Sequence, residues 1–197
     1  MTLTGPDLLT FLYRQWQDRV LGVVEDLSEQ QLRWRTAKVT SVAFNLWHLA
    51  RWDDLLASLL ADMTPSLHGR LGARPELWSS RGLAREWGFP TSLGHADTGM
   101  GIDEDVSVAL PLPAKPVLIG YARDAFGAMR ESLAAVSDGD LTDHGSVDLT
   151  RTPWLTEYGP RASVASWILS FADHGNRHLG MIEAIRGMQD LRGTASA

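Results

Sequence analysis

The stretch Val164 to Ile185 reads VASWILSFADHGNRHLGMIEAI and decides the predicted fold. Its apolar residues recur every three or four positions, the spacing that places side chains on one face of an α-helix. His174 and His178 fall on that same apolar stripe. Residues four apart lie one helical turn apart, so their β-carbons stand about 5–6 Å from each other. This separation suits two imidazole nitrogens that bind one metal ion at roughly 2.0–2.1 Å each.

A third histidine lies in a second predicted helix, Ser41 to Met63, on the stripe that should face inward: His48. Buried polar groups cost free energy unless they are partnered. One shared metal ion would partner all three imidazoles, so His48, His174 and His178 are the predicted metal ligands. In the alternative interpretation, the histidines are ordinary core residues and bind no metal.

Four long amphipathic segments predict an all-α fold, because no part of the chain shows the alternating pattern of a β-strand. They are Leu8 to about Leu27, Ser41 to Met63, Pro116 to Val136, and Pro160 to about Gly187. The second segment should end near Met63, since the residue before Pro65 is pushed out of the helical region. The turn-forming residues Ser137 to Asp140 should end the third. We expect a four-helix bundle formed by a single domain, residues 1–197.

The predicted second and third helices are joined by a long connection, residues 64–116, which is rich in glycine and proline. We expect it to be largely irregular, with short helical pieces around Glu76 to Trp87 and Asp103 to Ala109. A joint of this length permits the two helices to be parallel neighbours. The connection either covers the predicted metal site or merely links the two helices. His68 and His95, which lie in it, are expected to be exposed to solvent.

Composition narrows the class of protein. The chain has 197 residues and a formal net charge of -6, which argues against a general nucleic-acid binder because such a protein needs a basic face. The absence of cysteine excludes disulfides, thiolate ligands and a cysteine nucleophile. The chain begins without a secretory signal pattern, and no apolar run approaches the ~20 residues that span a bilayer. We expect a cytoplasmic protein with no membrane partner.

Several polar residues adjoin the histidines in sequence. We expect Asp53 and Asp173 to be surface charges or hydrogen-bond partners of the ligands rather than a general base. We expect Arg51 and Asn176 to lie on an exposed helix face, from which they could also orient a substrate. The tryptophans nearest the histidines in sequence fill the core or wall a pocket; they are Trp47, Trp52 and Trp167.

The order of these motifs resembles the DinB-like superfamily of metal-binding four-helix bundles. The motif Asn45-Leu46-Trp47-His48-Leu49 is followed much later by HGNRHLGMI at residues 174–182. The connection also resembles the long insertion of one branch, at PELW (75–78), GFP (88–90) and GMG (99–101). The resemblance covers nearly the whole chain and implies that His48, His174 and His178 are the metal ligands. Many relatives carry glutamine where this chain has Met181.

The resemblance implies a divalent-metal-binding protein related to transferases and isomerases that use small thiols such as bacillithiol or mycothiol. Three imidazoles suit zinc, nickel or iron, and they leave a coordination position open, as in catalytic zinc sites. Our first hypothesis is a metal-dependent thiol S-transferase that acts on a small-molecule substrate with a low-molecular-weight thiol as co-substrate. A non-catalytic metal-binding or interaction bundle and a metal-assisted hydrolase are the alternatives. We also expect a homodimer.

Overall fold

Four long helices dominate the computed structural model, which describes residues 3–94, 96–144 and 162–192. They are α1 (Gly5–Glu25), α3 (Val42–Met63), α8 (Lys115–Ala134) and α10 (Val164–Gly187). Within these ranges no β-strand forms, and an isolated β-bridge joins His144 to Ser163. The predicted all-α class is therefore confirmed.

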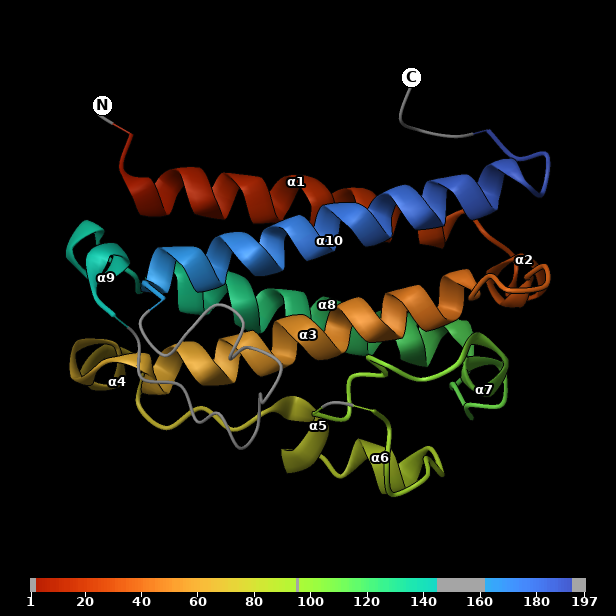
Figure 1. The fold of residues 1–197 in the computed structure, drawn as a ribbon, viewed down its shortest axis with the longest axis horizontal. Helices are drawn as coiled ribbons and strands as arrows, with labels where there is room; N and C mark the ends of the chain where they lie inside the picture. The colour runs from red at the N-terminus through yellow and green to blue at the C-terminus, as the bar shows by residue number, and fades with distance from the viewer. Residues whose placement is uncertain (1–2, 95, 145–161, 193–197) are drawn as a thin grey trace.

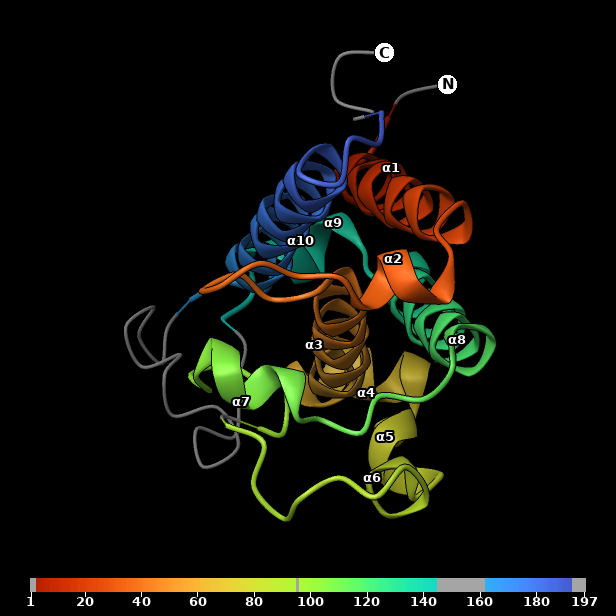
Figure 2. The same cartoon turned by 90° about the vertical axis from the view of Figure 1, so that its right-hand side faces the viewer.

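The four long helices, which we call the bundle, lie side by side (Figures 1 and 2). Both α1 and α3 pack against α8 and α10. In Figure 1, α1 and α10 run in one direction and α3 and α8 run in the other. The parallel pair α3 and α8 is the arrangement that the long connection permits. None of the described helices is long and apolar enough to cross a membrane.

Side-chain caps explain where the long helices α1, α3 and α10 begin. The Thr4 hydroxyl accepts a hydrogen bond from the Asp7 backbone N–H, and the Asp7 carboxylate accepts one from the Thr4 N–H. Ser41 caps α3 and Ser163 caps α10, each by accepting a backbone N–H three residues ahead. A cap of this kind is worth about 1 kcal/mol. The last helix thus begins at Val164, whereas the sequence suggested Pro160, which lies outside the described residues.

Short helices decorate the bundle: α2 (Glu29–Arg33), α4 (Pro65–Leu71), α5 (Leu77–Ser80), α6 (Leu83–Glu86), α7 (Glu104–Val108) and α9 (Asp138–Thr142). The helical pieces expected in the connection correspond to α5, α6 and α7. Two helices were not expected. Pro65 ends α3 but also occupies the first turn of α4, where proline is favoured. Ser137 and Asp140 form a capping box, so α9 stands where a turn was predicted.

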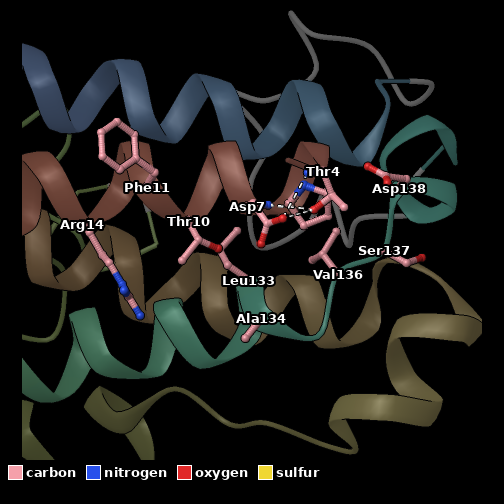
Figure 3. Close-up of a pocket in the computed structure, with 11 residues that line it drawn as sticks. Thr4, Asp7, Thr10, Phe11, Arg14, Leu133, Ala134, Val136, Ser137 and Asp138 are labelled. Carbon is pink, nitrogen blue, oxygen red and sulfur yellow. Dashed lines mark hydrogen bonds between the residues drawn. The ribbon is translucent and has the colours of Figure 1, made fainter. Parts of the chain in front are cut away.

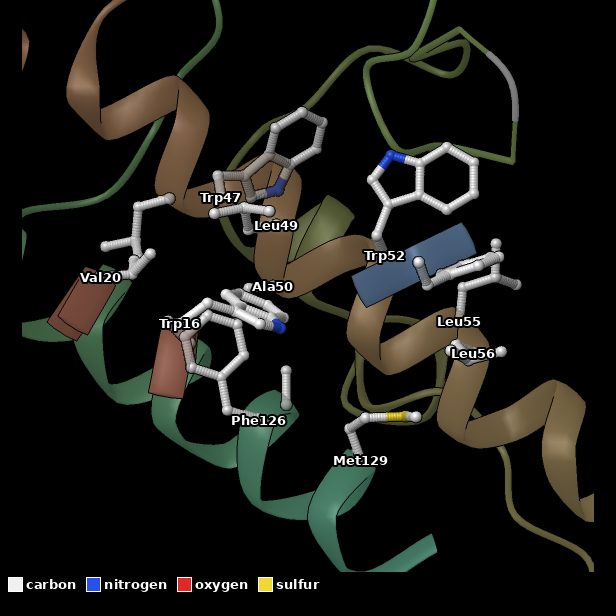
Figure 4. Packing of buried hydrophobic residues seen from close by; sticks show 14 of the residues in the cluster. Trp16, Val20, Trp47, Leu49, Ala50, Trp52, Leu55, Leu56, Phe126 and Met129 are labelled. Atoms are coloured by element: carbon white, nitrogen blue, oxygen red, sulfur yellow. The ribbon is translucent and has the colours of Figure 1, made fainter. Parts of the chain in front are cut away.

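The core is centred on α3, which is buried around nearly its whole circumference. On its α1 and α8 side, Trp16 and Phe126 meet edge to face with ring centroids 5.3 Å apart (Figure 4). The short helices α2, α4 and α5 cover other parts of α3. Because α3 has no broad solvent face, its polar residues are buried as well.

Candidate metal centre

The three predicted ligands converge in the structure. His48 comes from α3, and His174 and His178 come from successive turns of α10, which packs against α3. Their ring centroids are 4.4 to 5.0 Å apart. One ligand atom from each ring can be chosen so that all three atoms lie within 4.8 Å of one another. His48 is buried, and the other two are half-buried.

The His48 ring is oriented by the long connection. Its Nδ1 lies 2.5 Å from the backbone carbonyl oxygen of Thr98. A carbonyl oxygen can only accept, so Nδ1 carries the proton and Nε2 keeps its lone pair. Nε2 faces Nε2 of His174 at 3.1 Å. The connection therefore contributes directly to the centre through Thr98.

A side chain orients the His178 ring in the same manner. Asn45 accepts a hydrogen bond from Nδ1 of His178 through Oδ1, at 2.7 Å. The Asn45 amide cannot be flipped, because its Nδ2 donates to the Thr40 hydroxyl and to the carbonyl of Ser41. Two of the three imidazoles thus have an Nδ1–H partner of the kind that commonly fixes metal-binding histidines.

Burial favours the neutral form of each imidazole. It lowers the pKa of His48 to about 3, with a further lowering by charge on His178 and Arg51 that the Thr98 carbonyl partly opposes. Burial and the neighbouring histidines lower the pKa of His174 to about 2, and burial with the charge of Arg177 lowers that of His178 to about 4. Near pH 7 all three rings are neutral, which is the form that binds metal.

The geometry fits a metal ion. Two nitrogens that each lie 2.0–2.1 Å from a tetrahedral ion are about 3.3 Å apart. The distance between the Nε2 atoms of His48 and His174 is 3.1 Å, close to that value. One ligand atom from each of the three rings lies within 4.8 Å of the other two. Three neutral nitrogen donors with two of their Nδ1–H groups satisfied suit zinc, nickel or iron.

Aromatic rings surround His48. Phe44 stacks on it with a centroid distance of 5.6 Å, and Trp52 meets it edge to face at 6.1 Å. The Trp52 indole N–H also donates to Nε2 of His48 at 3.1 Å, so an ion bound to that nitrogen would replace this hydrogen bond. The Trp52 ring lies 5.3 Å from His174. Trp47 turns instead toward Trp78 and Phe89. Trp52 is therefore a wall of the site, while Trp47 fills the core.

The prediction that Arg51 lies on an exposed helix face was wrong, since its side chain is 1% exposed. Asp53 is likewise buried, and it accepts a hydrogen bond from Gln17 on the α1 side of α3. Both errors follow from the burial of α3 on all sides. Asp173 and Asn176 are exposed, as expected. His68 is exposed and contacts Asp62, while His95 lies outside the described residues.

Sequence reasoning missed two residues that orient the ligands. Asn45 precedes His48 by three positions, so helical spacing already placed it on the same face. Thr98 left no comparable signal, because it acts through its backbone carbonyl and any residue type has one.

A hollow lies elsewhere, between the start of α1 and the end of α8 (Figure 3). Its lining includes Asp7, Phe11 and Arg14 from α1 and Leu133 from α8. None of the three histidines lines it. The candidate centre is therefore the cluster between α3 and α10 and not this hollow.

Comparison with known proteins agrees with the arrangement of the helices. A family model described as the DinB superfamily matches residues 12–182. The crystal structure of a conserved protein from Enterococcus faecalis is similar over 94% of this chain and 96% of that chain, with a TM-score of 0.70 and 17% sequence identity. That likeness shows a shared fold. No curated protein matches the sequence.

Proposed function

Because the chain belongs to the DinB superfamily, we propose that it is a metal-dependent enzyme in which three histidines hold one divalent ion and a small thiol acts as co-substrate. The observation that carries the proposal is the convergence of His48, His174 and His178, whose ligand atoms lie within 4.8 Å of one another. Three protein ligands leave a coordination position for a substrate or water, the pattern of catalytic sites.

The residues around this centre have different roles. Asn45 and Thr98 bind Nδ1 of His178 and of His48, which leaves Nε2 of each ring as the nitrogen that can bind the ion. Phe44 and Trp52 exclude water from the His48 side, because their rings pack against that imidazole. The half-buried histidines, His174 and His178, form the side that a small molecule would approach.

A bound zinc, nickel or iron ion would supply Lewis acidity, which lowers the pKa of a coordinated thiol or water. The chain has no cysteine, so a thiol must arrive from outside as a low-molecular-weight compound. The resemblance to thiol-dependent transferases and isomerases supports a thiol co-substrate, and the three-histidine centre supports the ion. Transfer of such a thiol to a small electrophilic substrate is the reaction class that we propose.

The first experiment is elemental analysis of protein purified without a histidine tag, together with the His48→Ala variant. We expect about one divalent ion per chain in the wild type and a loss of that ion in the variant, with the helical circular dichroism retained. A wild-type protein that holds no ion, and takes up none on titration with zinc, nickel or iron, would remove the basis of the proposal.

The second experiment tests the thiol. The metal-loaded protein is incubated with small electrophiles in the presence and absence of a low-molecular-weight thiol, and adducts are followed by mass spectrometry. We expect product only when both metal and thiol are present. Turnover of ester or amide substrates without thiol would instead identify a metal-assisted hydrolase, and metal binding without any turnover would identify a non-catalytic metal-binding bundle.

A further inference from the structure

We propose that Arg51 is a positioning residue for the metal centre: it fixes the turn at residues 96–98, whose Thr98 carbonyl in turn orients His48. The inference rests on the proposed function, since it concerns how the same centre is held in shape. Arg51 lies one turn along α3 from His48, and its guanidinium donates hydrogen bonds to the turn and to the carboxylates of Asp54 and Glu76. Its positive charge acts on His48 directly and would be kept by lysine, whereas its hydrogen bonds act on His48 through the connection.

The guanidinium of Arg51 binds two consecutive carbonyls of the turn. Nε donates to the Asp97 oxygen at 2.9 Å, and Nη2 donates to the Ala96 oxygen at 3.2 Å. The same group pairs with Glu76 at 2.8 Å and with Asp54 at 3.2 Å. With its side chain 1% exposed, Arg51 has no competing water. The Nε and Nη2 donors of Arg51 thus anchor the turn within a buried network.

The turn needs an anchor because its backbone is strained. Ala96 has φ 47° and Asp97 has φ 53°, both in the left-handed region that residues with a β-carbon seldom adopt. Two such residues in succession persist only where the surroundings hold them. The carbonyls of these same two residues are the ones that Arg51 binds.

The other end of the turn is fixed by close packing. Gly99 has φ 82°, and a β-carbon there would lie 2.6 Å from Cζ3 of Trp47 and 3.1 Å from the ring of Phe44. Its N–H donates to the Leu93 carbonyl at 2.7 Å. Thr98, between the two anchors, reaches Nδ1 of His48 at 2.5 Å. Hence α3 supplies His48 and also the side chains that hold the turn whose Thr98 carbonyl binds His48.

Arginine suits this role because its planar fork carries five donors, which a lysine ammonium cannot reproduce. A purely structural role is the rival explanation, because Arg51 also pairs with buried Asp54 and half-buried Glu76. The two explanations differ in one respect. Only the positioning role requires that a variant which still folds bind metal more weakly. A purely structural role requires only a loss of stability.

The first test is Arg51→Lys, which keeps the positive charge but loses the fork. Cobalt(II) titration, followed by its visible absorption bands, reports both affinity and ligand geometry. We expect affinity to fall by up to about 10–100-fold, the effect of removing a hydrogen-bond partner of a metal ligand, because the Thr98 carbonyl would lose its position. The control is Arg186→Lys, which changes another buried arginine that binds a backbone carbonyl, that of Val23. It should lower stability and leave cobalt affinity and spectrum unchanged.

A second pair of variants decides the matter if Arg51→Lys does not fold. Gly99→Ala should push the turn away from Trp47 and weaken cobalt binding. Gly88→Ala introduces comparable backbone strain at φ 76°, but no atom lies within 4 Å of the new β-carbon, so cobalt binding should be unchanged. A folded Arg51→Lys with the cobalt affinity of the wild type would overturn the inference. If Arg51→Lys does not fold, wild-type cobalt affinity in Gly99→Ala would overturn it instead.

Nitrogen-15 NMR of the metal-free protein separates this inference from the proposed function. We expect His48 to show a protonated Nδ1 that exchanges slowly with solvent, and Arg51→Lys to speed that exchange. If the wild type binds no metal but this signal behaves as expected, the proposed function fails and the positioning role stands. If the wild type binds cobalt while the His48 Nδ1 proton exchanges at the same rate in Arg51→Lys, the positioning role fails alone.

Discussion

Asn45 is the residue on which the orientation of His178 depends. Its Oδ1 accepts from Nδ1 of that ring, while its amide protons are used by Thr40 and Ser41. We expect Asn45→Ala to weaken metal binding about 10–100-fold, because the ring loses the partner that fixes its tautomer and angle. Isothermal titration with zinc measures the change.

The matched control for Asn45→Ala is Asn176→Ala. Asn176 is exposed and its amide donates to the Ala172 carbonyl within α10, so the substitution should leave zinc affinity unaltered. Equal losses in both variants would mean that the amide of Asn45 has no special relation to the centre.

Asp140 gives the fold a defined dependence on pH. Burial opposes its charged form, but hydrogen bonds from Arg70 and Ser137 outweigh burial and lower its pKa from 3.8 to about 2. As pH falls below 3.8, the unfolded chain takes up a proton before the folded one does. The stabilisation is therefore complete above pH 3.8 and is lost as pH falls toward 2.

We expect Asp140→Asn to lower the free energy of unfolding by about 1–2 kcal/mol at pH 7, allowing for the partial exposure of Arg70. At pH 2, where the folded carboxyl is half ionised, the loss should be less than about 0.5 kcal/mol. Urea denaturation at several pH values measures this difference. Asp143→Asn, at the exposed other end of α9, should change stability by less than about 0.5 kcal/mol at each pH. A loss for Asp140→Asn that is equal at pH 7 and pH 2 would contradict the account.

At the scale of the helix, Gly175 sets how closely α10 approaches α1. A β-carbon at this position would lie 2.6 to 2.8 Å from the Trp16 indole, which is itself buried. We expect Gly175→Ala to lower the free energy of unfolding by about 1–3 kcal/mol, because the two helices must separate. Thermal and urea denaturation measure it.

Gly180→Ala is the control on the same helix. No atom lies within 4 Å of the added β-carbon, so only the helix propensity changes, and we expect a gain of up to about 1 kcal/mol. If both alanine variants were more stable than the wild type, Trp16 would not lie as close to Gly175 as we describe.

The long helices could be predicted from sequence because each has an apolar stripe and recognisable ends. The same reasoning failed for polar residues of α3. It assumed that one face of every helix meets water, whereas α3 is covered by the bundle and by α2, α4 and α5. Arg51 and Asp53 are buried for that reason. Helical periodicity describes one element and does not reveal which helix will be central.

The convergence of the three histidines could be predicted because helical spacing links His174 to His178 and puts His48 on an inward stripe. The turn that orients His48 could not be predicted from the sequence. It depends on left-handed backbone at Ala96 and Asp97, residue types that do not indicate such a conformation as glycine does. Its position was set by a contact with Arg51, some forty-five residues earlier in the chain.

Considered as a whole molecule, the chain brings ligands together from distant parts of the sequence. His48 and His174 are separated by 126 positions and lie on antiparallel helices. An unfolded chain does not hold these residues together, so an ion that binds them binds the folded state alone. The expected homodimer and cytoplasmic location stay predictions; light scattering of the metal-loaded protein checks the dimer.

Metal binding should therefore stabilise the entire fold. At an ion concentration 100 times the dissociation constant, linkage predicts a gain of about 2.7 kcal/mol. For a chain of this size that gain corresponds to a rise in Tm of about 5–10 °C. Differential scanning calorimetry with and without zinc measures the rise. His48→Ala should abolish it, whereas His68→Ala should retain it, because His68 is exposed and lies outside the cluster. A rise in Tm of the same size in His48→Ala would mean that zinc binds elsewhere on the protein. One ion would then not link α3 to α10.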